Sequence, residues 1–329
     1  MSPRRGSPLA RWSAPAAEQA LADDVRSGLS DARQKTIPSR WLYDNIGTAL
    51  FEAICLVPEY GLARADARIL GNHALQITEL AGHPACVAEL GSGGGSKTRL
   101  LLEPLAREAA PIYVPIDVSS AALSRCEAEL AWVPGLRLDP FHGEYLEGLS
   151  YATRIRRRGE TLMVLFLGSS LGNFHRPEAE DFLREMRGIL AAGDFILLGT
   201  DLLKPETQLI DAYDDSAGIT AAFNLNLLGR LNRELGARFD LFRFYHEARW
   251  NQAERRIEMH LRSLGAQRVD IPGAGISVSL RSGETIWTES SYKFEPGEAA
   301  LLARRAGYRV VGRWSDARWP FCESLLRAV

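Results

Sequence analysis

The feature that most constrains the fold of this chain is a short apolar strand that runs directly into a glycine-rich loop. Residues 86–90 are mostly apolar, and four glycines follow within the next five positions. From Ser96 onward the sequence takes on an amphipathic helical pattern. Glycine has no Cβ to keep a ligand at a distance, and the N–H groups of a following helix face such a loop. The arrangement is therefore typical of a nucleotide-binding cradle.

The residues around the loop favour one class of nucleotide over two others. A phosphate-binding P-loop needs four residues between its first glycine and Gly-Lys-Ser/Thr, and no such string occurs here. A dinucleotide fingerprint needs G-x-G-x-x-G, but the third glycine, Gly95, comes one place early. Glu89-Leu90-Gly91-Ser92-Gly93 resembles motif I of class I S-adenosylmethionine-dependent methyltransferases, and Asp117 ends a second apolar strand where a ribose diol needs an acceptor. A flexible loop without a ligand stays open as an alternative.

Composition and charge exclude several classes of function. The net charge of −2 argues against a general nucleic-acid partner. No apolar run is long enough to span a bilayer, and no hydrophobic signal segment follows the basic, proline-rich residues 1–17. We therefore expect a cytoplasmic protein without a membrane partner, whose residues 1–17 form a disordered arm. The cysteines and histidines are scattered without metal-ligand spacing, so no metal site is expected.

Strands and helices alternate over much of the chain. Apolar runs and helical periodicity predict strands at 86–90, 112–117, 136–141, 161–168 and 194–200, and helices near 97–109, 119–131 and 177–191. Further elements are predicted as helices over 205–236, short strands over 247–292, a helix at 296–306 and closing strands at 308–312 and 322–326. The basic run 154–158 is predicted to be a solvated loop.

The βαβ repetition predicts an α/β fold with a doubly wound, mostly parallel sheet. Continuous apolar runs such as residues 162–167 suit strands that are covered on both faces. We expect a Rossmann-like class I methyltransferase domain, formed by residues 61–200 and 293–329. A second, α+β substrate-binding domain is expected from residues 18–60 and 201–292, where the pattern changes.

Several separated motifs resemble the bacterial histidine Nα-methyltransferases, which form hercynine on the route to ergothioneine. The likeness runs from about residue 35 to the C-terminus, with its motifs in the family's order and spacing. The motifs include Trp41-Leu42-Tyr43-Asp44, Pro58-Glu59-Tyr60, Gly172-Asn173, Ala212-Tyr213-Asp214-Asp215, Arg255-Arg256-Ile257-Glu258-Met259 and Glu289-Ser290-Ser291-Tyr292-Lys293. The resemblance implies Nα-trimethylation of L-histidine with S-adenosylmethionine as cofactor, by an enzyme that we expect to be a monomer.

The resemblance also assigns roles to individual residues. The implied substrate-binding residues are Tyr60, Asn173, Tyr213, Met259, Glu289 and Ser291. The α-amine is placed near three residues that we predict to be catalytic, namely Tyr43, Phe51 and Gly168. An amide and a phenol can donate hydrogen bonds to a substrate carboxylate, whereas a carboxylate and a hydroxyl suit the two nitrogens of an imidazole. No dedicated catalytic base is expected.

The cofactor-binding residues that the resemblance implies are Glu89, Gly91, Ser92, Gly93, Lys97, Asp117, Glu144 and Tyr145. The family's usual Gly-Asp-Phe adenine motif stands here as Gly143-Glu144-Tyr145, in which the glutamate still accepts from an exocyclic amine and the tyrosine still stacks. A second departure follows Tyr60, where Gly61-Leu62-Ala63-Arg64 replaces the family's Tyr-Pro-Thr-Arg.

Three alternatives stay open beside this hypothesis. An Nα-methyltransferase for tryptophan or another aromatic amino acid is disfavoured because an indole has no use for Glu289 and Ser291 together. A non-catalytic binding paralogue would be expected to have a spoiled cofactor loop, whereas Glu89, Gly91 and Asp117 are intact. A nicotinamide dehydrogenase would bind NAD rather than S-adenosylmethionine.

Overall fold

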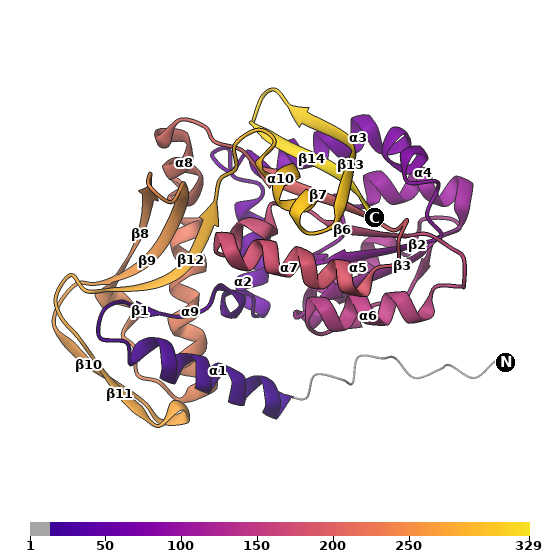
Figure 1. The fold of residues 1–329 in the computed structure, drawn as a ribbon. Coiled ribbons are helices and arrows are strands. Elements are labelled where there is room, and N and C mark those ends of the chain that lie inside the picture. Colours follow the sequence, from indigo (N-terminus) through magenta and orange to yellow (C-terminus); the bar gives the residue numbers. More distant parts are fainter. Residues whose placement is uncertain (1–13) are drawn as a thin grey trace. The chain divides into compact units, whose positions relative to one another are not determined.

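The computed structural model describes residues 14–329, and Figure 1 shows the ribbon coloured along the sequence. Contacts divide the described residues into two units. The first contains Leu62–Leu202 and Phe294–Val329, and the second contains Leu203–Lys293 together with the described residues up to Gly61. Each unit is described below by itself.

The prediction of a disordered arm over residues 1–17 is wrong for its last residues. Residues 1–13 lie outside the described residues, so that part of the prediction stays open. Helix α1 (Ala14–Leu29) begins at Ala14, which makes residues 14–17 helical. Its Leu21, Val25 and Leu29 recur at helical spacing and are buried, and this apolar stripe attaches the helix to the second unit.

The first unit is built on one large sheet. Its strands are β2 (Cys86–Leu90), β3 (Ile112–Asp117), β4 (Arg137–Leu138), β5 (Phe141–His142), β6 (Leu162–Phe166), β7 (Phe195–Asp201), β13 (Tyr308–Asp316) and β14 (Phe321–Ala328). Their order is β13-β14-β7-β6-β2-β3-β4, with β5 also paired to β3. All neighbours are parallel except β14, which runs antiparallel to both β7 and β13. This is the class I methyltransferase sheet, and the predicted fold class is confirmed.

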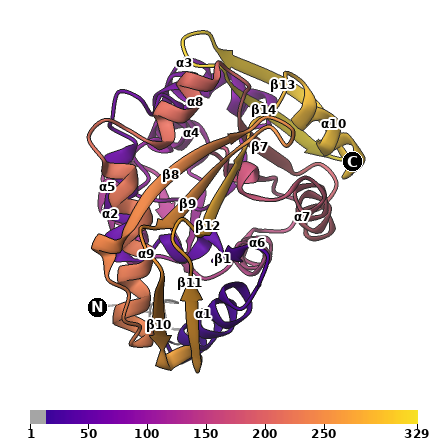
Figure 2. The ribbon, with the colours of Figure 1, turned by 90° about the vertical axis from the view of Figure 1, so that its left-hand side faces the viewer.

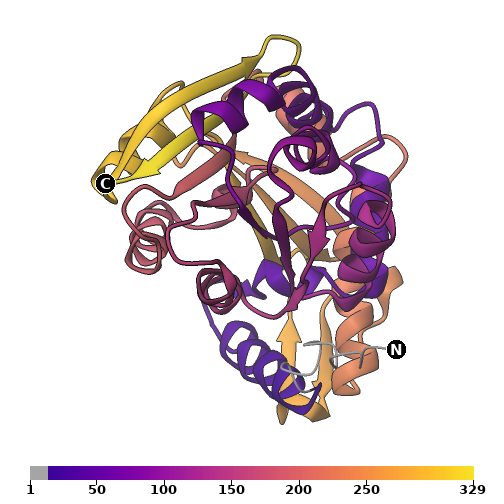
Figure 3. The same ribbon diagram turned by 90° about the vertical axis from the view of Figure 1, so that its right-hand side faces the viewer.

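Helices cover both faces of this sheet (Figures 1 and 3). An apolar cluster on one face joins the strands to α6 (Tyr145–Ile155), α7 (Arg176–Ile189) and α10 (Glu298–Arg305). The other helices of the unit are α3 (Leu62–Leu80), α4 (Arg99–Ala109) and α5 (Ser120–Leu130). The central strands β2 and β6 are buried along their whole length, as expected for parallel strands covered on both sides. The yellow β13–β14 pair lies at one edge of the sheet (Figures 1 and 3).

Helix α6 has no counterpart among the predicted helices. Its fourth residue, Gly148, is a poor helix former and weakens the sequence pattern. The structure gives the reason for this glycine, because a Cβ at position 148 would lie 2.5 Å from Cγ2 of Ile116. The helix therefore approaches β3 more closely than any side chain would allow.

Two further predictions in this unit need correction. The single strand expected at 136–141 is split into β4 and β5, because Pro140 between them has no N–H to donate to a neighbouring strand.

The basic run 154–158 is not simply a solvated loop. It begins in the last turn of α6, and the Arg156 guanidinium pairs with Asp194, which is buried. Asp194 also accepts from the backbone N–H groups of Leu162 and Ala191, at 3.1 and 2.8 Å.

The second unit holds a sheet in the order β1-β12-β9-β8 and a separate β10–β11 hairpin. Figure 2 shows β8, β9 and β12 side by side, with the hairpin extending from one end. The strands are β1 (Lys35–Thr36), β8 (Phe244–Asn251), β9 (Arg256–Ser263), β10 (Gln267–Ile271), β11 (Ile276–Leu280) and β12 (Thr285–Tyr292). The helices are α1, α2 (Asn45–Ile54), α8 (Glu206–Tyr213) and α9 (Ile219–Leu235). The helices and short strands predicted over 205–236 and 247–292 are confirmed.

No helix in the part of the chain that the structure describes is both long enough and apolar enough to cross a membrane. Within residues 14–329, no group of three or more histidine, cysteine, aspartate or glutamate side chains is arranged to hold a metal ion.

Candidate functional site

The glycine loop after β2 adopts a backbone that only glycine tolerates well. Gly91, Gly93 and Gly95 have φ values of +73°, +54° and +76°. A Cβ at Gly91 would lie 3.1 Å from the hydroxyl oxygen of Tyr145, whereas a Cβ at Gly93 would meet no described atom within 4 Å. The space beside Gly93 is therefore open to a ligand. The nearby Ser92 hydroxyl is buried and has no hydrogen-bond partner among the described residues.

Asp117 anchors this loop from the end of β3. Its Oδ2 accepts from the backbone N–H of Gly93 at 3.1 Å, and its Oδ1 accepts from the N–H of Ser119 at 2.8 Å. Burial raises the pKa of Asp117, and these backbone donors act in the opposite direction. A carboxylate offers about four lone-pair directions, so Asp117 retains acceptor capacity for a ribose hydroxyl. An open loop, an unpartnered hydroxyl and a nearby carboxylate fit the amino-acid and ribose parts of S-adenosylmethionine.

Glu89 is held inside the first unit by two hydroxyl groups. Thr98 Oγ1 lies 2.7 and 2.9 Å from its carboxylate oxygens, and the Tyr113 hydroxyl also donates to it. Burial raises the pKa of Glu89 to about 7, against the opposing effects of Lys97 and the hydroxyl donors. Its carboxylate is thus tied to the start of α4, next to the glycine loop.

Lys97 and Gly168 meet at a single carboxylate. Asp66 Oδ2 accepts from Lys97 Nζ at 2.5 Å and from the Gly168 N–H at 3.0 Å. Gly168 follows β6 with a φ of +68°, which favours glycine. Burial acts to lower the pKa of Lys97, but Asp66 and Glu89 outweigh it and raise the pKa above its usual value. Asp66 had no predicted role.

The predicted adenine residues lie at the start of α6. Glu144 is the exposed N-cap residue of this helix. The Tyr145 ring packs edge-on against Phe166 and Phe182, with centroids 5.8 and 6.1 Å apart, while its hydroxyl faces Gly91. Asn173, predicted to bind the substrate, is the half-buried last residue of the 3-10 helix η2 (Ser170–Asn173).

In the second unit, four of the predicted substrate and catalytic residues form one aromatic cluster. The ring centroids are 5.5 Å apart for Tyr43 and Phe51, 6.3 Å for Phe51 and Tyr60, and 6.0 Å for Tyr60 and Tyr213. Phe223 of α9 completes the cluster, 5.5 Å from Tyr43 and 6.0 Å from Phe51. Sequence analysis missed Phe223 because it looks like any other apolar residue of a helical stripe.

A buried polar group adjoins the aromatic cluster. The Tyr213 hydroxyl donates to Ser291 Oγ at 2.7 Å, and Lys293 Nζ donates to both oxygens at 2.8 and 2.9 Å. Lys293 is fully buried, with Nζ 4.6 Å from the Tyr213 ring centroid. Because Ser291 accepts two hydrogen bonds, its own proton remains to be donated elsewhere. Lys293 belongs to a sequence motif but had no predicted role.

Glu289 and Met259 stand on the same face of the sheet as Ser291. Glu289 pairs with Met259, and Ser291 pairs with Ile257, across β12 and β9. The β12 register shifts between Trp287 and Glu289, and such bulges often re-aim a side chain near a functional site. Glu289 is buried rather than at a solvated edge. Burial raises its pKa to about 7, with Lys293 acting against this.

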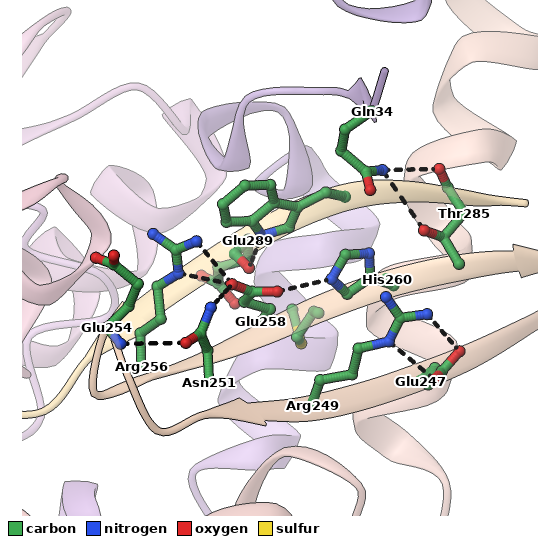
Figure 4. Close-up of polar contacts among 12 residues, drawn as sticks. Gln34, Glu247, Arg249, Asn251, Glu254, Arg256, Glu258, His260, Thr285 and Glu289 are labelled. Carbon is green, nitrogen blue, oxygen red and sulfur yellow. Dashed lines mark hydrogen bonds and ion pairs between the residues drawn. The ribbon is translucent and has the colours of Figure 1, made fainter. Parts of the chain in front are cut away.

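The opposite face of the same strands carries a different polar network (Figure 4). Asn251, Arg256 and His260 all converge on the carboxylate of Glu258, at 2.9, 2.8 and 3.2 Å. Burial acts to raise the pKa of Glu258, but these three partners outweigh it and bring the pKa to about 2. Nδ1 of His260 has no hydrogen-bond partner among the described residues, whereas the Glu258 carboxylate accepts from all three side chains. Within residues 14–329, Lys293 is the one charged group that acts on Glu289, whereas Glu258 accepts from three side chains.

Comparison with known proteins agrees with the class that the sheet defines. The chain matches the model of the family "Histidine-specific methyltransferase, SAM-dependent" over residues 21–328. The chain therefore belongs to this family of S-adenosylmethionine-dependent methyltransferases.

Similar proteins include two mycobacterial relatives with the printed name histidine N-alpha-methyltransferase. The relative from Mycolicibacterium smegmatis is 41% identical over 95% of this chain and 96% of its own length. The relative from Mycobacterium tuberculosis is 40% identical over 93% of this chain and 94% of its own. Ergothioneine biosynthesis protein 1 of Neurospora crassa is 29% identical over 85% of this chain, which spans 32% of that longer protein.

Proposed function

We propose that this enzyme transfers three methyl groups from S-adenosylmethionine to the α-amine of L-histidine, forming hercynine for ergothioneine biosynthesis. The observation that carries the proposal is the pairing of one donor with one acceptor on β12. Ser291 has a hydroxyl proton to donate, because Tyr213 and Lys293 both donate to its oxygen. Glu289, two positions earlier on the same face, offers a carboxylate that accepts.

This pair matches a neutral imidazole. A neutral imidazole presents one N–H donor and one unprotonated nitrogen acceptor, whereas an indole presents a donor only. Tryptophan would satisfy Glu289 but would leave the Ser291 proton without an acceptor, at a cost of about 1–3 kcal/mol for a buried group. The names of the mycobacterial relatives point to the same substrate.

The remaining assignments extend this proposal to the amino-acid end of histidine. Asn173 is proposed to donate to the carboxylate, together with Tyr213. The single hydroxyl proton of Tyr213 would then turn from Ser291 to the carboxylate, and Lys293 would still donate to the Ser291 oxygen. Tyr43 and Phe51 are proposed to face the amine, and their ring faces stabilise the positive charge that becomes permanent at the third methylation. Gly168 is proposed to lie beside the reacting nitrogen.

The proposed mechanism is a direct in-line displacement. The cofactor supplies an electrophilic methyl group on its sulfonium. The residues of the chain orient a neutral amine, keep water out and let the amine release its proton before each further transfer. The cofactor is proposed to be held by the residues of the glycine loop and its neighbours, namely Glu89, Gly91, Ser92, Gly93, Lys97, Asp117, Glu144 and Tyr145.

The substrate assignment is tested by calorimetric binding of L-histidine and L-tryptophan to the Ser291→Ala variant. We expect the variant to bind histidine about tenfold more weakly, because the unprotonated ring nitrogen loses its donor. Its affinity for S-adenosylmethionine should not change. Ser290→Ala is the matched control, because Ser290 pairs with Glu258 on the other face. Unchanged histidine affinity in Ser291→Ala, or an equal loss in the control, would contradict the assignment.

A further inference from the structure

The carboxylate that joins Lys97 to Gly168 has a second acid beside it, from the far end of the chain. Glu323 lies on β14 opposite Gly199 of β7, and it is fully buried. A Cβ at Gly199 would lie 2.6 Å from Glu323 Oε1 and 3.2 Å from the backbone N of Gly168. Glycine at position 199 therefore leaves room for the Glu323 carboxyl group, which interacts with Asp66, on the side where the Gly168 backbone approaches.

Three carboxylate oxygens in this group have no donor. Asp66 Oδ2 accepts from both Lys97 and Gly168, but Asp66 Oδ1 and both oxygens of Glu323 lack hydrogen-bond partners among the described residues. Two carboxylates cannot satisfy each other, because neither has a hydrogen to donate. A single proton between them supplies the missing donor, as in other pairs of adjacent carboxyl groups.

The charges around Glu323 also favour a neutral acid. The charged or titratable groups that influence it are Asp66 of α3, Lys97 before α4 and Cys322 of β14, and Glu89 acts on the same Lys97. Lys97 is one cation among three carboxyl groups, so ionising all three would leave uncompensated negative charge in the interior. Burial, and then the neighbouring Asp66, raise the pKa of Glu323 well above its usual range.

We propose that Glu323 is a neutral carboxylic acid that donates its proton to Oδ1 of Asp66, and that this acid pair positions Lys97 and the Gly168 amide. Glu323 is thus a positioning residue that acts through Asp66. Its proton fixes the rotation of the Asp66 carboxylate, and Oδ2 then holds the Lys97 ammonium and the Gly168 N–H together. The inference uses residues of the first unit alone and does not depend on which amino acid is methylated.

The first test compares thermal unfolding of wild type, Glu323→Gln and Glu185→Gln between about pH 5 and pH 9. The native protein holds a proton on Glu323 that the unfolded chain releases above the usual glutamate pKa, so wild-type stability falls as pH rises. Glutamine keeps a donor but cannot ionise. The melting temperature of Glu323→Gln minus that of wild type should therefore increase as the pH rises. Glu185 is exposed on α7, and its variant should follow wild type.

The second test separates positioning from simple packing. Glu323→Gln should keep kcat within about threefold of wild type, whereas Glu323→Ala should lose about tenfold or more, because Asp66 is left without its donor. Infrared spectroscopy of protein labelled with carboxyl-13C glutamate is recorded at about pH 9, where Glu89 and Glu289, with a pKa raised to about 7, are ionised. Wild type should show a protonated carboxylic acid band there that is absent from Glu323→Gln. This measurement needs no substrate and no folded alanine variant. The same pH slope in Glu323→Gln and wild type, or the absence of that band, would overturn the proposal.

Discussion

Two buried glutamates, Glu89 and Glu289, both have a pKa raised to about 7 by burial, but their surroundings give them different tasks. Glu89 accepts from Thr98 and Tyr113, which tie its carboxylate to the start of α4 and to β3. For Glu289, the nearby Lys293 is the one group among the described residues that favours the charged form. A carboxylate that titrates near neutral pH can change its own charge when the charge of a bound imidazole changes.

The pKa of Glu289 predicts a pH-dependent affinity for histidine. Below about pH 7 the carboxylate becomes protonated and is a poorer acceptor for the imidazole N–H, so KM for histidine should rise as pH falls. Glu289→Gln cannot titrate and should lose this dependence. The variant should retain only the pH dependence of the substrate's own groups, and its KM at pH 8 should exceed that of wild type. Steady-state kinetics from about pH 6 to pH 9 provide the comparison, and identical profiles for the two proteins would exclude Glu289 from the imidazole site.

Single residues were predictable from the sequence where they stand in motifs. The glycine loop after β2 is of this kind, because the glycines that allow its backbone conformation follow one another along the chain. Phe223, Asp66 and Glu323 were not predictable, because their roles arise only when distant segments meet. Glu323 illustrates this, since its place opposite Gly199 depends on the pairing of β14 with β7.

At the scale of elements, strong periodicity predicted the central strands and most helices to within a few residues. The failures have local physical causes. Gly148 weakens the helical sequence pattern of α6, although it allows the helix to pack closely on Ile116. Pro140 divides a predicted strand into β4 and β5. The bulge before Glu289 could not be predicted either, because only the pairing of β12 with β9 defines it.

The glycine loop offers a test of how local conformation supports cofactor binding. Gly91→Ala should lower the stability of the cofactor-free protein by more than the roughly 1–2 kcal/mol that a left-handed backbone costs alone, because the new Cβ meets Tyr145. Gly93→Ala should carry only that backbone cost, since no described atom lies within 4 Å. Both variants should bind S-adenosylmethionine more weakly. Chemical denaturation with and without cofactor separates the two effects, and equal losses of stability would argue against the Tyr145 contact.

At the scale of the whole molecule, the sheet topology and the family match both identify the chain as a methyltransferase. The strand order with its antiparallel β14 defines the methyltransferase class. The family match over residues 21–328 covers both units, including the segment between β7 and α10 that supplies Glu289 and Ser291. That the second unit binds the substrate is a proposal, which rests on the aromatic cluster and on the donor–acceptor pair of β12.

The most direct test of the central claim is mass spectrometry of products formed by the purified protein with S-adenosylmethionine and each common amino acid in turn. We predict that histidine gains three methyl groups on its α-nitrogen and that tryptophan gains none. Methylation of a different amino acid, with histidine unchanged, would contradict the substrate assignment and leave only the methyltransferase fold and cofactor loop in place.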